Sequence, residues 1–66
     1  MNRDELRAAI ARKAISKKEL AKELGLSSVS LYNKLTGKCE FKESEIRTLI
    51  RVLELTPESV NLIFLS

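Results

Sequence analysis

The chain has 66 residues, of which 44% are hydrophobic and 32% are charged, and its formal net charge at pH 7 is +3. A chain of this length forms one domain, predicted to span residues 1–66, and buries only about 60% of its unfolded surface. Because it has one cysteine, no histidine and no apolar run near the roughly 18 residues of a membrane span, we expect no disulfide, metal, cofactor or membrane partner.

The amino-terminal segment predicts a helix over about residues 3–13. Asn2 is followed three residues later by Glu5, which is the spacing of an N-cap with a carboxylate in the first turn. The apolar side chains of Leu6, Ala9 and Ile10 then recur at helical intervals.

A second helix is predicted to begin after Ser16, because Ser16 and Glu19 repeat the same capping signal. Gly25 stands where a left-handed residue commonly ends a helix. The apolar stripe of this helix consists of Leu20, Ala21 and Leu24.

A third helix is predicted over residues 28–35, with Ser27 as its N-cap and Gly37 beyond its end. At about 100° per residue, Leu31 and Leu35 lie roughly 40° apart and face the core. An outer arc of about 140° holds small and medium-sized side chains: Ser28, Val29, Tyr32, Asn33 and Thr36.

Residues 36–43 are predicted to form a loop from which Phe41 docks on the core. The apolar period that follows predicts a fourth helix over about residues 43–54, although Lys42 stands where a Ser or Thr cap is usual. Thr56 followed by Pro57 predicts the start of a short fifth helix over about residues 57–63. We expect residues 57–66 to support the fold and to contribute a dimer contact.

Positive charge is concentrated in the middle of the chain. Residues 12–38 carry seven basic and two acidic side chains, a net charge of +5, whereas residues 39–66 carry three basic and five acidic ones, a net charge of −2. The natural partner of such a field is a polyanion, and the alternative is that the lysines only solubilise the surface.

Residues 16–37, SKKELAKELGLSSVSLYNKLTG, read as two short helices joined by one tight turn. An alanine, then Leu-Gly-Leu-Ser, then an apolar residue four positions after that serine make this segment resemble the helix-turn-helix of the phage lambda repressor and Cro family. The tail, with Phe41, SEIRTLIRVLEL and TPESVNLIF, is similar to that of small Cro-type regulators of Gram-positive phages. The resemblance implies an all-α, five-helix, lambda-repressor-like DNA-binding domain whose helix-turn-helix is formed by the second and third helices.

The resemblance also implies roles for individual residues. Base edges would be contacted by Ser28, Val29, Tyr32 and Asn33, and the DNA backbone by Lys17, Ser27, Ser30, Lys34, Thr36 and Lys38. Because many family members carry Gln or Arg where this chain has Ser28 and Val29, specificity is expected to depend on Asn33, on water or on DNA shape. The alternatives are that Tyr32 lies at the core edge and that Asn33 is only a surface amide.

The carboxyl-terminal segment has more apolar residues than one short helix can bury inward. We expect a second copy to be contacted across a two-fold axis by Val60, Ile63, Phe64 and Leu65. The alternative is that these four side chains and that of Leu62 all close the core of the monomer.

The sequence therefore predicts a sequence-specific, double-stranded DNA-binding transcriptional regulator. We expect a phage-type repressor that acts by operator occupancy, binds a palindromic operator as a homodimer, and works on the nucleoid in the cytoplasm of a bacterial host. We expect neither enzymatic activity nor a small-molecule substrate. The alternative is a protein-interaction module, such as an antirepressor or antitoxin, that uses the same fold.

Overall fold

The computed structural model describes residues 1–65. The regular secondary structure of these residues consists of helices, with no strand. The prediction of an all-α, five-helix domain is confirmed over these residues; Ser66, the end of the predicted domain, lies outside them. Its helices are α1 (Arg3–Lys13), α2 (Lys17–Leu24), α3 (Ser28–Thr36), α4 (Glu43–Val52) and α5 (Pro57–Phe64). The predicted bounds therefore need only small corrections, because α3 and α5 extend one residue further and α4 ends two residues earlier.

Side chains of the predicted caps begin four of the five helices. In each case a side-chain oxygen accepts a hydrogen bond from the backbone N–H three residues on, at 3.1 or 3.2 Å. Each bond satisfies a donor that has no partner within the first helical turn. The four caps are Asn2, Ser16, Ser27 and Thr56.

The start of α4 has no side-chain cap at Lys42, and a carboxylate of its first turn bonds back to this residue. The backbone N–H of Lys42 donates a 2.8 Å hydrogen bond to Oε1 of Glu45, which lies in the first turn of the helix. At its other end α4 stops before the predicted residue 54, because Glu54 has a φ of 51° and therefore leaves the right-handed helical conformation.

Every helix contributes to one core. Its buried apolar side chains are Leu6, Ala9, Ile10, Leu20, Ala21, Leu31, Leu35, Phe41, Leu49, Leu53 and Ile63. Phe41 lies in the α3–α4 loop and is buried, so its predicted docking on the core is confirmed. Helix α1 lies against both α3 and α5, and α2 lies against α3 and α4.

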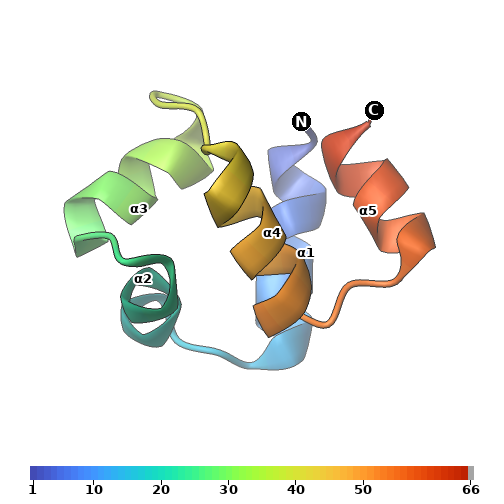
Figure 1. The fold of residues 1–66 in the computed structure, drawn as a ribbon, viewed down its shortest axis with the longest axis horizontal. Coiled ribbons are helices and arrows are strands. Elements are labelled where there is room, and N and C mark those ends of the chain that lie inside the picture. Colours follow the sequence, from blue (N-terminus) through green and yellow to red (C-terminus); the bar gives the residue numbers. More distant parts are fainter. Residues whose placement is uncertain (66) are drawn as a thin grey trace.

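The helices α3 and α5 lie at opposite ends of the long axis of the molecule, with α1 and α4 between them (Figure 1). The backbone extends 29 Å along that axis. The start of the chain is joined to the end of α5 by a 2.6 Å hydrogen bond from the backbone N–H of Asn2 to the carbonyl oxygen of Ile63.

Candidate nucleic-acid interface

A tight turn joins α2 to α3. Gly25 adopts the left-handed conformation, with φ 70° and ψ 29°, and the N–H of Leu26 donates a 2.9 Å hydrogen bond back to the carbonyl oxygen of Ala21. A Cβ atom added to Gly25 would meet nothing within 4 Å. Glycine is therefore favoured here by the backbone conformation and not by a lack of space.

The inner edge of the α2–α3 unit is apolar and buried. Leu31 and Leu35 of α3 are both buried, as the helical spacing predicts, and so are Leu20 and Ala21 of α2. Burial of large side chains from both helices fixes how the two cross, since a shift of either would open a cavity in the core.

The outer face of α3 is exposed. The side chains of Val29 and Tyr32 are large and apolar but 70% and 64% exposed, and Ser28 and Thr36 are also exposed. Tyr32 thus lies on the outer face and not at the core edge. Asn33 is half-buried. Its backbone carbonyl oxygen accepts hydrogen bonds from the N–H of Cys39 and the hydroxyl of Thr36.

The residues predicted to contact the DNA backbone differ in their exposure and in their hydrogen bonds. Lys17 is exposed in the first turn of α2, and Lys38 is exposed just beyond α3. Ser27 and Ser30 are linked to each other, because the Ser27 hydroxyl oxygen accepts the N–H of Ser30 at the start of α3. Thr36 is exposed at the end of α3.

Lys34, which was predicted to contact the DNA backbone, is buried and not exposed. Its ammonium group is buried and donates a 2.6 Å hydrogen bond to Oε1 of Glu45 in α4. The physical reason is position: Lys34 is three residues after Leu31 and beside Leu35, so it lies along the buried edge of α3.

The buried pair changes the acidity of Glu45. Burial by itself raises the pKa of this carboxyl group, but the hydrogen bonds from Lys34 and from the N–H of Lys42, together with both positive charges, lower it more. The net pKa of Glu45 is below its ordinary value, so the carboxylate form is favoured in the folded protein.

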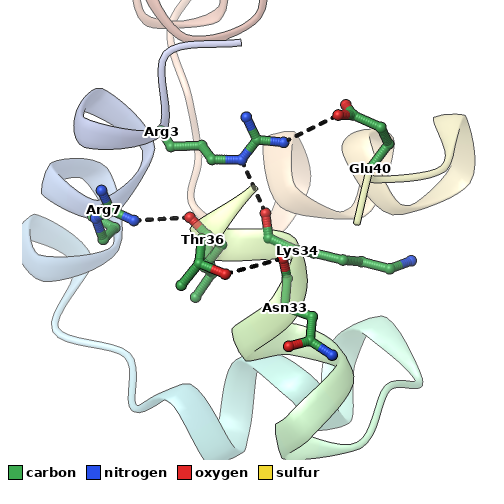
Figure 2. A network of polar contacts seen from close by, with 7 residues as sticks. Arg3, Arg7, Asn33, Lys34, Thr36 and Glu40 are labelled. Atoms are coloured by element: carbon green, nitrogen blue, oxygen red, sulfur yellow. Dashed lines mark hydrogen bonds and ion pairs between the residues drawn. The ribbon is translucent and has the colours of Figure 1, made fainter. Parts of the chain in front are cut away.

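Two arginines of α1 bind the carboxyl end of α3, a contact that the sequence analysis did not identify. Nε of Arg3 donates to the carbonyl oxygen of Lys34 at 3.1 Å, and Nη1 of Arg7 donates to the carbonyl oxygen of Leu35 at 2.8 Å (Figure 2). The partners are 31 and 28 residues apart in the chain, so no local sequence signal indicates the contact.

The residues of the predicted dimer contact differ in exposure, and one of them is buried in the monomer. Ile63 is only 1% exposed and belongs to the core of the monomer. Val60 and Phe64 are half-buried, and Leu65 is 75% exposed. Leu62, another apolar residue of this segment, is exposed on the same helix.

Within residues 1–65 there is no group of three or more residues able to hold a metal ion. Over the same part of the chain, every helix is too short or too polar to cross a membrane.

Residues 2–66 match a family model described as "Protein of unknown function (DUF739)". Neither a curated protein nor a solved structure matches the chain.

Proposed function

The chain belongs to the DUF739 family, and we propose that it is a sequence-specific, double-stranded DNA-binding transcriptional regulator. In this proposal α2 and α3 act as a helix-turn-helix, and α3 enters the major groove. The observation that carries it is the two-sided character of α3, which is buried along Leu31 and Leu35 but exposes Val29 and Tyr32. The major groove is about 12 Å wide and accepts one helix held in this way.

The exposed side chains of α3 suit base edges. An exposed apolar side chain such as that of Val29 can contact the methyl group of thymine in the major groove. Ser28 adds a hydroxyl group to the same exposed face. The amide of Asn33 is of the type that bonds adenine at two positions.

Exposed lysines supply the electrostatic part of the proposed interface. Lys17, Lys18 and Lys22 are all exposed on α2, and Lys38 is exposed beyond α3. Lys17 also lies at the amino end of α2, where backbone N–H groups and the helix dipole favour phosphate. Pairing with Glu45 removes Lys34 from this set, which leaves the charge mainly on α2 and on the loop.

We propose further that the protein binds a palindromic operator as a homodimer and represses by occupying it. Leu65 and Leu62 are exposed near the carboxyl end of α5, at the end of the molecule opposite α3 (Figure 1). Half-sites about 34 Å apart require each α3 to lie roughly 17 Å from the two-fold axis. A molecule 29 Å long has room for that spacing. With this function the protein acts on the nucleoid in the bacterial cytoplasm.

Selection of bound duplexes from a random pool tests the proposal. We expect enrichment of an inverted repeat with half-sites one helical turn apart, and affinity that falls by about 0.9 log units per phosphate contact for each tenfold rise in salt. Lys17→Gln should weaken binding to every sequence, whereas Arg47→Gln, at an exposed site on α4 paired with Glu43, should change it little.

Two results would overturn the proposal. One is the absence of any enriched duplex; the other is binding that does not respond to salt. A stable protein complex that forms without any enriched duplex would favour the alternative of a protein-interaction module, in which Val29 and Tyr32 face a polypeptide.

A further inference from the structure

We infer that Arg3 and Arg7 of α1 are positioning residues that fix α3 in the orientation it needs to read DNA. The part of the inference that concerns DNA binding rests on the proposed function. The part that concerns the orientation of α3 can be measured without DNA. Neither arginine lies on the outer face of α3, so neither is proposed to read bases.

The last carbonyl groups of a helix have no partner within the helix and carry partial negative charge. In α3, the carbonyl oxygens of Lys34 and Leu35 receive guanidinium groups at 3.1 and 2.8 Å. Hydrogen bonds from a charged donor are stronger than neutral ones, and here they join two helices that are far apart in sequence.

Each guanidinium group is held on its other side as well. Nη2 of Arg7 donates to Asp4 at 2.7 Å, one turn earlier on α1. Nη2 of Arg3 lies 3.5 Å from a carboxylate oxygen of Glu40 in the α3–α4 loop (Figure 2). Arg3 is also packed against the end of α3, since a Cβ atom at Gly37 would lie 3.4 Å from its guanidinium carbon. Each arginine thus bonds the end of α3 and a second group, and the two together connect α1 to α3.

The arginines complete a set of supports around α3. The Gly25 turn ties its amino end to α2, Lys34 ties its side to Glu45 of α4, and the arginines tie its carboxyl end to α1. A binding site works when such supports hold it to within about 0.5 Å and 10–20° of the productive geometry. Loss of the α1 support should let α3 tilt about its other two attachments.

The first test measures the orientation of α3 directly. Residual dipolar couplings of backbone amides give the angle between α3 and α1 in the wild type, in Arg7→Gln and in Arg12→Gln. Arg12 is a matched control because it is an exposed arginine on the same helix. It lines a groove together with Leu53 and Ser59, and no residue of α3 lines this groove. We expect the angle to change in Arg7→Gln and to stay unchanged in Arg12→Gln; an unchanged angle in both would overturn the inference.

The second test uses the duplex selected by the wild type. Arg7→Gln should lower specific affinity by about tenfold, the size expected when a charge-assisted hydrogen bond is lost. The slope of affinity against salt should stay as in the wild type, because no phosphate contact is removed. Equal losses on all sequences, with a slope smaller by about 0.9, would instead identify Arg7 as a phosphate contact and overturn the positioning role.

A third variant covers the case in which Arg7→Gln does not fold. Arg7→Lys keeps the charge but cannot bond the Leu35 carbonyl and Asp4 with one planar fork. We expect it to fold, to shift α3 and to lower specific affinity, whereas full wild-type affinity and orientation would overturn the inference. If the wild type binds no duplex, the proposed function fails, and the dipolar couplings still decide whether Arg7 positions α3.

Discussion

The ammonium group of Lys34 in α3 lies 2.6 Å from Oε1 of Glu45 in α4, and the two side chains are only 11% and 8% exposed. The same carboxylate oxygen accepts the N–H of Lys42, and the carbonyl oxygen of Lys34 accepts from Arg3. Through one residue, α3 is thus bonded to both α1 and α4. The pair joins α3 to α4 by a charged hydrogen bond between two buried side chains.

Removal of the ammonium group should destabilise the fold strongly. Lys34→Met leaves the carboxylate of Glu45 buried without its main partner, and we expect the free energy of unfolding in urea to fall by about 3–5 kcal/mol. Lys38→Met, at an exposed site, should change it by no more than about 0.5 kcal/mol. The double variant Lys34→Met/Glu45→Gln should recover most of the loss, and a Lys34→Met protein as stable as the wild type would contradict the prediction.

The same pair predicts a dependence of stability on pH. The pKa of Glu45 is lower in the folded protein than its ordinary value of 4.5, so the carboxylate contributes stability that is fully present above pH 4.5. This contribution is lost as the pH falls through the folded-state pKa. Urea unfolding at several pH values should show the stability advantage of the wild type over Glu45→Gln shrinking below pH 4.5; a constant difference would contradict it.

A strained residue at the end of α1 predicts a stabilising substitution. Ala14 adopts the left-handed conformation, with φ 60° and ψ 29°, which glycine adopts without the steric cost. Ala14→Gly should raise the free energy of unfolding by roughly 0.5–1 kcal/mol. The same substitution at Ala11, inside the helix, should lower it by about 1 kcal/mol. Two changes of the same sign in thermal unfolding would refute this reasoning.

Contact of Val29 with a thymine methyl group can be tested from both sides of the interface. On the selected duplex, Val29→Ala should weaken binding, and so should deoxyuridine in place of the contacted thymine, each by about 1 kcal/mol. Because both changes remove the same apolar contact, the second should have little further effect once the first is made. Fully additive losses at every thymine would show that Val29 does not contact a methyl group.

A charge at Leu65 should separate dimerisation from the reading of a half-site. Leu65→Glu places a carboxylate on the exposed apolar surface near the end of α5, whereas Asn61→Glu places one at an exposed polar site of the same helix. In sedimentation experiments on the complex with a palindromic duplex, we expect Leu65→Glu to occupy single half-sites at concentrations where the wild type and Asn61→Glu fill both. Identical occupancy by all three proteins would exclude a dimer contact at Leu65.

Most of the fold could be predicted because its signals are local. The caps at Ser16 and Ser27 need only a hydroxyl near the first N–H groups of a helix, and the left-handed turn at Gly25 needs only a residue without a side chain. Leucine spacing alone placed Leu31 and Leu35 on one buried edge. These features depend on residues within one or two helical turns.

The remaining features depend on partners that are distant in sequence. The spacing of Lys34 from Leu31 and Leu35 places it along the buried edge of α3, but its buried partner depends on the placement of Glu45 in another helix. Ile63 resembles its exposed neighbours in apolar character, and only the packing of α5 on α1 shows that it is buried. The contacts of Arg3 and Arg7 are hidden for the same reason.

The exposed and buried faces of α3 differ in how freely their residues can be substituted. Ser28, Val29 and Tyr32 are exposed, whereas the residues that hold the helix, Lys34 and the two leucines, lie along its buried edge. Substitutions at the three exposed positions can therefore accumulate with little cost to folding. One scaffold could acquire a series of different target sites by drift at these positions alone, and a library randomised there should consist mostly of folded proteins.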